Sequence, residues 1–188
     1  MRYGVLAVAA ACVLLLFAQC GAAGGAPSGP APARGGRGFN ATDVMFLQMM
    51  LPHQAQGVRL VRLARRHAVR PETATLAAAI ESTELAEAGG MADRLRGWRR
   101  PRTAPAHAHA AHGGMPQTSD AELRALDRVP DDRFERAFLN LLIAHQDDAV
   151  QLARLENRGG EDAWTRRLAE RVTRSRSAEI SRMLALLR

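Results

Sequence analysis

The chain is 188 residues long, which is enough for one domain with an N-terminal leader but short for two cores of ordinary size. Hydrophobic residues make up 47% and aromatic residues only 4%, and the many alanines and leucines favour an all-α fold. All 26 basic residues are arginines, which with 19 acidic residues give a net charge of +7. Because these arginines are scattered among acids without interleaved aromatic residues, they argue against a nucleic-acid-binding surface.

The first 20 residues have the pattern of a secretory signal. Arg2 precedes the apolar run YGVLAVAAACVLLLFA, which is followed by Gln19 and Cys20. This run is too short, and too closely followed by glycine, alanine and proline, to indicate a permanent membrane span. Both cysteines of the chain, Cys12 and Cys20, lie in this segment. The exported domain is therefore expected to lack an internal disulfide.

The sequence FAQCG around Cys20 resembles a bacterial lipobox, although Phe17 and Gln19 depart from the residues preferred there. The resemblance implies that Cys20 is lipidated, becomes the first mature residue and anchors the protein to the outer face of the membrane. The alternative is cleavage in the alanine-rich stretch after Cys20, followed by secretion. In both cases residues 21–38, rich in glycine, proline and alanine, are expected to form a flexible tether.

Beyond this tether, residues 39–188 have the pattern of a domain with four long helices. Apolar residues at helical spacing predict helices over 42–67, 71–98, 131–157 and 162 to the C-terminus. Pro71 suits a first helical turn, and the glycines of NRGG end the third helix. The crossover, residues 99–130, contains prolines and glycines and then a short helix capped at Ser119, with Glu122 three residues later. Two short connections and one long crossover predict a four-helix bundle.

The chain contains an internal repeat with a shift of 92 residues. The segment FLQMMLPHQAQGVRLVRLA, which starts at Phe46, matches FLNLLIAHQDDAVQLARLE, which starts at Phe138, without a gap. The register continues through the second helix of each half, so repeat 1 covers about 39–98 and repeat 2 about 131–188. A duplicated unit of this kind needs its copy to close a core. The predicted bundle therefore consists of two duplicated helical hairpins.

Each repeat carries a histidine and a glutamate within its apolar helical stripes. The histidines are His53 and His145, and the glutamates are Glu87 and Glu179. An unpaired buried carboxylate costs several kcal/mol, so each glutamate is expected to have a partner. One interpretation is purely structural. In it, His53 pairs with Glu87 and His145 with Glu179, or the pairs are crossed, and these hydrogen bonds do nothing more.

Methionines close to these groups support a second interpretation, a metal site. Met91 and Met183 each follow their glutamate by one helical turn, and Met49 and Met50 precede His53 by one turn. Imidazole nitrogen and thioether sulfur form a soft ligand set suited to Cu(I), and carboxylates would extend it to Cu(II). The alternative for these methionines is adaptable filling of the core.

The crossover contains a further group of metal-binding residue types in the segment HAHAAHGGM. The candidate ligands there are His107, His109, His112 and Met115. Histidine-rich tracts of this kind bind Cu(II), Zn(II) or Ni(II) loosely. The segment is therefore a candidate secondary metal site, and the alternative is an ordinary polar linker.

Together these features resemble the bacterial domain of unknown function 305 family. The resemblance covers about residue 39 to the C-terminus and rests on the phrases FLxxMLPHQ and FLxxLIAHQ, the two Glu-x-x-x-Met pairs, and HGGM in the crossover. It implies a ferritin-like bundle, exported or membrane-anchored, with some relatives linked to periplasmic copper binding and tolerance. Relatives often carry a second histidine where this chain has Gln54 and Gln146, so two candidate ligands are missing here.

The sequence thus favours an extracytoplasmic protein that binds copper, for sequestration or carriage, without catalysis. The Glu-x-x-His pairs of di-iron bundles, His-Glu-x-x-His, a nucleophile elbow and a glycine-rich phosphate loop are all absent. The expected partners are a metal ion and, through the lipid anchor, a membrane. The alternative is a metal-free helical domain of the cell envelope that docks a protein partner.

Overall fold

The computed structural model describes residues 38–105, 108 and 118–188. Over these ranges the chain forms five α-helices and no β-strand, which confirms the predicted all-α class. The helices are α1 (Ala41–Leu63), α2 (Pro71–Gly97), α3 (Asp120–Leu126), α4 (Asp131–Gly159) and α5 (Ala163–Leu186). In this part of the chain, no helix combines the length and apolar character needed to cross a membrane.

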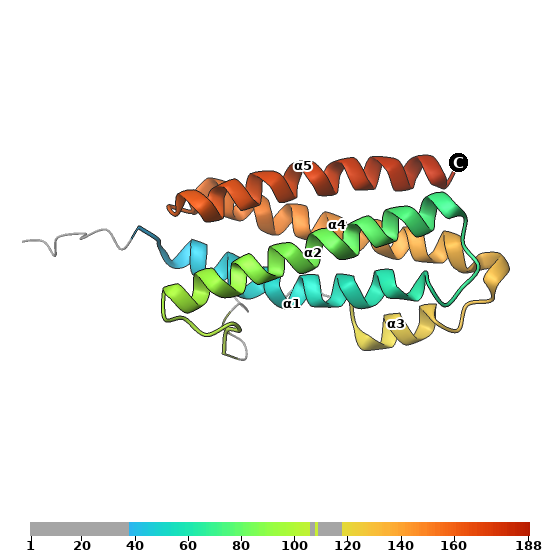
Figure 1. Ribbon diagram of the computed structural model, residues 1–188, viewed down its shortest axis with the longest axis horizontal. Helices are drawn as coiled ribbons and strands as arrows, with labels where there is room; N and C mark the ends of the chain where they lie inside the picture. Colours follow the sequence, from blue (N-terminus) through green and yellow to red (C-terminus); the bar gives the residue numbers. More distant parts are fainter. Residues whose placement is uncertain (1–37, 106–107, 109–117) are drawn as a thin grey trace, which may run out of the picture. The chain divides into compact units, whose positions relative to one another are not determined.

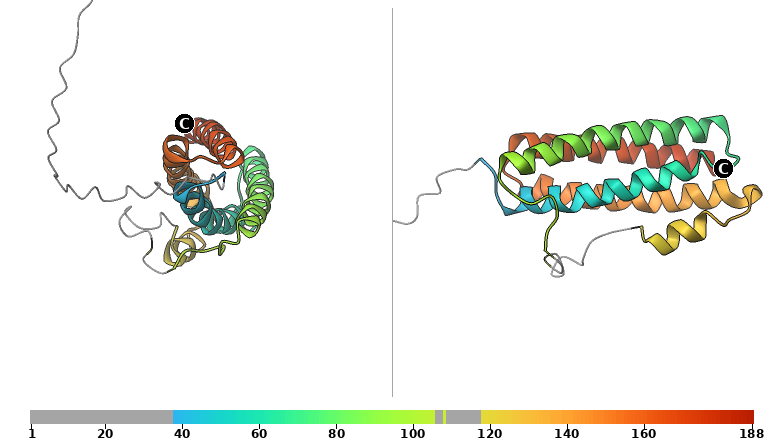
Figure 2. Two further views of the ribbon diagram at one scale, coloured as in Figure 1. Left: turned by 90° about the vertical axis from the view of Figure 1, so that its left-hand side faces the viewer. Right: turned by 60° about the horizontal axis from the view of Figure 1, so that its bottom comes forward.

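The four long helices form a bundle in which each neighbouring pair is antiparallel (Figure 1, Figure 2). α1 and α2 form one hairpin, α4 and α5 form the other, and α1 lies against α4. The start of α1 meets the end of α4, where the side-chain amide of Asn40 donates to the carbonyl of Gly159 over 2.7 Å. Likewise, Arg94 near the end of α2 pairs with Asp162, just before α5. The crossover returns the chain along the bundle, so that α2 and α4 run parallel.

Local sequence signals determine where the helices begin. Asn40 caps α1 by accepting hydrogen bonds from the amides of Thr42 and Asp43, and Asp43 accepts one from the amide of Asn40 in return. Ser119 and Glu122 form the same reciprocal pair before α3. Both arrangements satisfy amides that a helix start would otherwise leave without partners. The short helix predicted in the crossover is thereby confirmed.

Two helix ends differ by a few residues from the prediction. α1 ends at Leu63, not at residue 67, because the amides of Ala64, Arg65 and Arg66 bond to carbonyls three residues back in a tight final turn. α4 continues to Gly159, two residues past the predicted end, and stops where Gly160 adopts an extended backbone.

The interior contains two apolar clusters at opposite ends of the bundle. The entry-end cluster lies where α1 and α5 begin and α2 and α4 end, and its buried members include Phe46, Met49, Met50, Met91, Leu95, Leu152 and Leu168. The far-end cluster lies at the other end, and its members include Leu60, Ile80, Phe134, Phe138, Leu142 and Met183. Between the two clusters, at mid-length of all four long helices, the buried side chains are polar.

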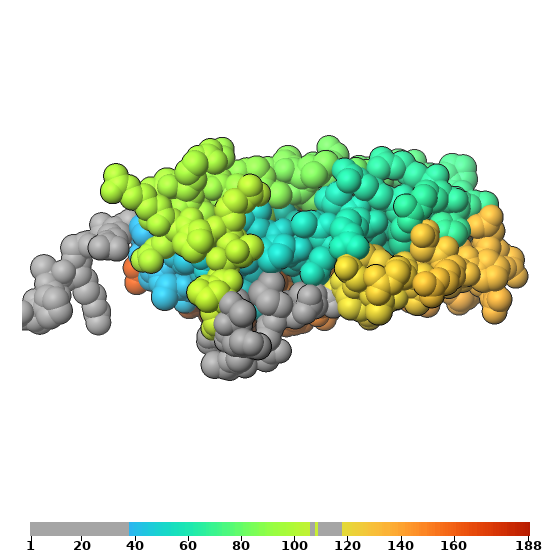
Figure 3. Space-filling model, turned by 90° about the horizontal axis from the view of Figure 1, so that it is seen from below, coloured from blue at the N-terminus to red at the C-terminus, as the bar shows by residue number. Residues whose placement is uncertain are grey.

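The short helix α3 packs on the outside of the bundle, beside α1 and α4 (yellow in Figure 3). Leu123 and Leu126 of α3 join the far-end cluster. An ion pair of 2.7 Å between Arg59 of α1 and Asp120 adds an electrostatic contact. The later part of the crossover is therefore attached to the bundle.

Two buried carboxyl groups lie at the junction of the entry end. Asp43 is fully buried, and its Oδ1 accepts hydrogen bonds from the amides of Glu161 at 3.1 Å and Asp162 at 2.9 Å. Glu156 is also fully buried, and its burial, assisted by the neighbouring Asp43, raises its pKa to about 8. Glu156 therefore keeps its proton at neutral pH, which avoids two buried negative charges side by side.

Candidate metal centre

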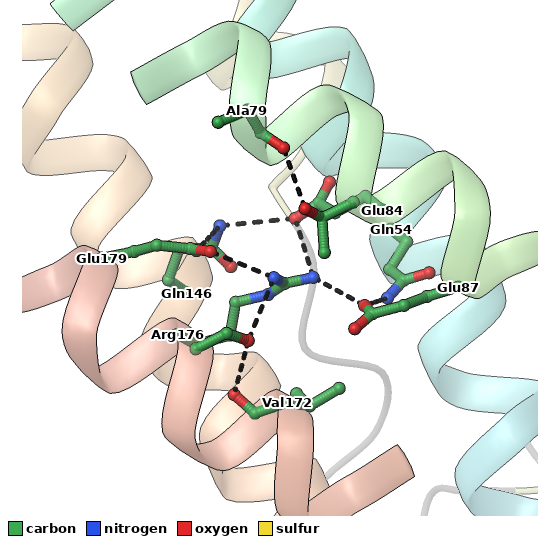
Figure 4. A network of polar contacts seen from close by, with 10 residues as sticks. Gln54, Ala79, Glu84, Glu87, Gln146, Val172, Arg176 and Glu179 are labelled. Carbon is green, nitrogen blue, oxygen red and sulfur yellow. Dashed lines mark hydrogen bonds and ion pairs between the residues drawn. The ribbon is translucent and has the colours of Figure 1, made fainter. Parts of the chain in front are cut away.

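The polar side chains at mid-length form one layer across the bundle, and Figure 4 shows its charged and amide members. We call this group the polar layer, and its eight members are His53, Gln54, Glu84, Glu87, His145, Gln146, Arg176 and Glu179. α1, α2, α4 and α5 each contribute two of them. The most exposed side chains are those of Glu87, at 11%, and Glu179, at 15%. The layer is therefore sealed from bulk water on most sides.

The two histidines point into the core and stack on each other. Their ring centroids lie 3.9 Å apart, the rings are inclined by 12°, and each residue is only 1% exposed. His145 Nδ1 is 2.9 Å from the hydroxyl of Thr118. Both ring nitrogens of His53, and Nε2 of His145, have no hydrogen-bond partner of acceptable geometry among the described residues. Three buried nitrogens are thus left without a hydrogen bond.

Burial keeps both imidazoles neutral. It lowers the pKa of His145 to about 4, with a further contribution from the positive charge of Arg176. It also lowers the pKa of His53 well below the ordinary value, and there His145 and Arg176 contribute. A neutral imidazole has a free lone pair on one nitrogen. Both histidines are therefore in the protonation state that metal ligation requires.

A glycine brings a carboxylate oxygen close to the histidines. A β-carbon at Gly57 would overlap Oε2 of Glu84 and would come within 2.7 Å of Nε2 of His145. Neither of these two atoms has a hydrogen-bond partner in the described part of the chain. The missing side chain at Gly57 therefore leaves room for an oxygen and a nitrogen donor to approach the same point.

Arg176 is the centre of the ionic part of the layer, as Figure 4 shows. Its guanidinium donates to Glu87 Oε2 at 2.8 Å and to Glu179 Oε1 at 3.2 Å, and it lies 3.7 Å from Glu84 Oε1. The side-chain amide of Gln54 donates to Glu87 at 2.7 Å, and that of Gln146 donates to Glu179 at 3.1 Å. Every carboxylate of the layer thus faces Arg176.

One cation among three carboxyl groups cannot balance three negative charges, and the pKa values reflect this. Burial raises the pKa of Glu84 to about 8, although Arg176 acts in the opposite direction. Burial also raises the pKa of Glu179, and the charge of Glu87 adds to that effect. Protonation of Glu84 therefore brings the layer closer to neutrality at pH 7.

The repeat explains the arrangement of the layer. With the shift of 92 residues, His53 corresponds to His145 and Glu87 to Glu179, and the contact between Gln54 and Glu87 is matched by the equivalent contact in repeat 2. The same shift places Glu84 over Arg176, a pair that sequence analysis overlooked. The two copies thus carry an acidic and a basic residue at equivalent positions that meet in the core.

The predicted pairing of histidines with glutamates is wrong. Glu87 and Glu179 bind Arg176 and the glutamines, whereas the rings of His53 and His145 lie on each other. The physical reason is that a buried guanidinium satisfies carboxylates better than a neutral imidazole does, because it brings a full charge and several donors. Gln54 and Gln146 donate hydrogen bonds to Glu87 and Glu179, so these glutamines also help to position the carboxylates.

The methionines do not all meet at one place. Met49, Met50 and Met91 belong to the entry-end cluster, and Met183 belongs to the far-end cluster. The two hairpins cross the middle of the bundle in opposite directions, so residues one turn beyond the layer in each repeat lie on opposite sides of it. Met91 and Met183, both candidate ligands, therefore lie on opposite sides of the layer.

Several expected features lie outside the described residues. These are the lipidation site Cys20 and the candidate secondary ligands His107, His109, His112 and Met115. Within the described ranges, no three histidine, cysteine, aspartate or glutamate side chains form a ready ligand set for a metal ion. A metal site in the layer would therefore need a methionine sulfur as a ligand, or the rotation of an imidazole ring towards the ion.

A surface hollow of about 410 Å³ between α1 and α2 reaches the layer from outside. Its lining includes Pro52 and Gln54 of α1, Glu84 of α2, and Arg102 after α2. Pro52 has no amide hydrogen, so α1 lacks one helical hydrogen bond beside His53. The hollow offers a small ion a route towards Glu84.

Comparison with known proteins identifies the family. The model of the family "Domain of unknown function (DUF305)" matches residues 43–187. The chain belongs to the DUF305 family. A DUF305 protein from Streptomyces coelicolor superimposes with a TM-score of 0.73 and 27% identity, over 78% of this chain and 91% of that one. A DUF305 fragment from Deinococcus radiodurans gives 0.68 and 28%, over 79% and 96%.

A third similar structure belongs to a protein with metal bound. CopM in its Cu(I)-bound form gives a TM-score of 0.63 and 28% identity, over 78% of this chain and 96% of that chain. CopM has also been solved with Cu(II) and with silver. No curated protein sequence matches the chain. A protein with a similar fold, CopM, has therefore been solved with copper and with silver bound.

Proposed function

We propose that this DUF305 protein binds copper as Cu(I) in its polar layer, and that it sequesters or carries the ion outside the cytoplasm without catalysis. The observation that carries the proposal is the pair of buried, neutral imidazoles with three unpartnered nitrogens. Each unpartnered buried polar atom costs about 1–3 kcal/mol, and a bound cation would remove that cost for a nitrogen that directs its lone pair at the ion. Copper and silver in CopM support the choice of a soft metal.

The ligands that we assign lie on the entry-end side of the layer. Met49 and Met50 precede His53 by one turn, and Met91 belongs to the same cluster. Thioether sulfur together with imidazole nitrogen selects Cu(I). The positions in repeat 2 that correspond to Met49 and Met50 are leucines, so this set of donors exists on one side only. We therefore propose one copper site in the bundle.

The two histidines would contribute unequally. A ring nitrogen directs its lone pair in the plane of the ring, and two rings inclined by only 12° cannot direct lone pairs at one ion. His53 has no hydrogen bond to hold its ring, whereas Thr118 holds His145. His53 is therefore the first nitrogen ligand in our proposal, and His145 joins only when a ring turns.

The carboxyl groups would adjust the charge of the layer. Glu87 and Glu179 offset Arg176 at 2.8 and 3.2 Å, so that the layer can accept a cation. Glu84 has one oxygen without a partner beside Nε2 of His145. A cation nearby would favour the ionised form of Glu84, and we therefore expect copper uptake to release a proton.

A second, looser site is proposed in the crossover, at His107, His109, His112 and Met115. Four donors within nine residues can bind Cu(II), Zn(II) or Ni(II) without a folded cavity. This site would act separately from the polar layer, and the experiment below distinguishes the two.

For location, we propose export with a lipid anchor at Cys20. The apolar run and FAQCG support this proposal. The name of the Streptomyces coelicolor relative also includes the word "secreted". Cys20→Ser is expected to move the protein from the membrane fraction into the medium. Unchanged partitioning of this variant would reject the lipid anchor.

A metal-free interaction domain of the cell envelope is the second candidate. It is favoured by the contacts of Arg176, which give all three carboxylates of the layer a charged neighbour without any metal. In that case the histidines would serve packing only. Metal content separates the two candidates.

The test is an anaerobic Cu(I) titration against a competing chelator. His53→Ala combined with His145→Ala is expected to abolish tight binding. Met91→Leu and Met183→Leu form a matched pair, because both residues are fully buried methionines that follow their glutamate by one turn. Only Met91→Leu should weaken binding. Equal effects of the two leucine variants would contradict the entry-end site.

Replacement of His107, His109 and His112 by alanine controls for the crossover. If copper binding is lost only in this variant, the function belongs to the crossover and not to the layer. If the wild-type protein binds Cu(I) no better than a protein without a metal site does, the copper proposal is wrong.

A further inference from the structure

The entry end of the bundle carries a group of arginines without acidic partners. Six of them are exposed: Arg99, Arg100 and Arg102 after α2, Arg158 near the end of α4, and Arg166 and Arg167 in the first turn of α5. None forms a salt bridge with a described residue. We call this surface the basic end. The residues that follow α2 project from it (lime green in Figure 3).

The acidic groups at the basic end do not balance this charge. Asp93 pairs with another arginine, Arg96, at 2.5 Å, Asp43 is buried, and the exposed Glu161 can offset only one of the six arginines. At the opposite end of the bundle, by contrast, arginines are paired with acids, as Arg66 is with Asp127 at 2.8 Å and Arg70 with Glu135 at 2.9 Å. Exposed arginines thus lie at both ends, but the basic end has fewer exposed acids among them.

Both tryptophans of the chain lie at the basic end. Trp98 and Trp164 line one hollow of about 520 Å³, and the guanidinium of Arg94 lies over both rings, at 5.4 and 5.7 Å. Phe39 stacks on Trp98 with ring centroids 4.2 Å apart. Indole rings beside arginines are the combination that prefers the headgroup region of a bilayer. A nucleic acid would instead need bare rings for base stacking, and here Phe39 and Arg94 cover them.

The path of the chain favours the same partner. The described chain begins at Gly38, which leads directly into α1 at the basic end (Figure 1). The residues before it include the 16-residue apolar run and a stretch rich in glycine, proline and alanine. A membrane contact of that run would tether the bundle by the end at which α1 begins.

We propose that the basic end binds a bilayer surface rich in anionic headgroups, with Trp98 and Trp164 at the level of the headgroups. Each arginine close to an anionic surface strengthens partitioning by about fivefold. Removal of three of them should therefore weaken it by about 100-fold. This interaction requires neither copper nor a lipid on Cys20, so it stands apart from the proposed function.

Tryptophan fluorescence provides a direct test, because both indoles of the chain lie at this end. The full chain is mixed with vesicles whose acyl chains carry bromine, a quencher of indole emission. One set consists of phosphatidylcholine alone, and the other contains equal amounts of phosphatidylcholine and phosphatidylglycerol. Strong quenching is expected with the anionic set and little with the neutral set, and added salt should reverse it.

Matched variants locate the contact. Replacement of Arg99, Arg100 and Arg102 by glutamine should lower partitioning by about 100-fold. The same replacement of Arg124, Arg128 and Arg136, which are exposed at the opposite end, removes equal charge and should change quenching only slightly. Circular dichroism verifies that both variants are folded, and the salt dependence of the wild-type protein tests the proposal without any variant.

Three results would overturn the proposal. The first is equal quenching by neutral and anionic vesicles, which would show insertion through the N-terminal run without contact by the basic end. The second is an equal loss in the two triple variants, which would indicate attraction by net charge alone. The third is a change of tryptophan emission with DNA or an acidic polypeptide but not with vesicles, which would identify another polyanion as the partner.

Discussion

Removal of the buried guanidinium is the sharpest test of how the polar layer is held together. Arg176 is 1% exposed, and its nitrogens lie 2.8 Å from Glu87 and 3.2 Å from Glu179. Arg176→Met keeps much of the side-chain volume but removes the charge. At an effective dielectric constant of about 20, opposite charges about 3 Å apart attract by about 5 kcal/mol. Since part of this offsets desolvation, we expect the variant to lose about 3–5 kcal/mol of unfolding free energy.

Glu87→Gln should lower the free energy of unfolding much less, by about 1 kcal/mol. The reason is that the charge of Glu87 raises the pKa of Glu179. Once that charge is gone, Glu179 gives up its proton more readily and takes over the balance of Arg176. The double variant should be more stable than Arg176→Met alone, because it contains neither the guanidinium nor the carboxylate that it neutralised.

Urea unfolding at pH 7, followed by circular dichroism, measures all three changes. Arg124→Met, at an exposed position without a salt bridge, should change the free energy by less than about 0.5 kcal/mol. If Arg176→Met and Glu87→Gln cost the same and their effects simply add in the double variant, then Arg176 contributes packing and not charge, and the reasoning fails.

Two further substitutions test the packing and the protonation of buried groups. Gly57→Ala should lower the free energy of unfolding by about 1–3 kcal/mol in denaturant titrations, because its methyl group would meet Glu84 and His145. Gly89→Ala, with nothing within 4 Å of its β-carbon, should raise that free energy by about 1 kcal/mol. A gain at both positions would refute the crowding at Gly57. Glu156→Gln tests a carboxyl whose pKa is raised to about 8, so that the stability of the wild-type protein should fall as pH rises from about 4.5 to 8. In thermal melts, the glutamine variant should be no more stable than the wild type near pH 4, and its advantage should grow up to about pH 8. An advantage that is the same at every pH would rule out this titration.

The fold could be predicted because the signals that specify it are local or periodic. The 92-residue repeat defined two hairpins, and the apolar stripes placed His53 and His145 inside the bundle, where both are 1% exposed. The capping pair Ser119 and Glu122 located α3. Each of these features depends on neighbours within about one helical turn or on the register of the two copies.

The contacts within the site could not be predicted in the same way. Arginines are seldom buried, so Arg176 was placed with the surface residues, although the shift of 92 puts it over Glu84. A stripe pattern shows which residues face inward but not which of them touch. Those contacts depend on the length of each side chain and on where the two hairpins cross, and for this reason the separation of Met183 from Met91 could not be predicted either.

The different residues Glu84 and Arg176 make the two halves of the chain non-interchangeable. Two copies of repeat 1 would bring two protonated Glu84 side chains together with no arginine between them, and two copies of repeat 2 would bring two Arg176 side chains together. Two guanidinium charges this close in a buried layer oppose association. The 3.7 Å contact between Glu84 and Arg176 therefore gives each half a preference for the other half over itself. The two halves are therefore distinct, and each depends on being joined to the other in one chain.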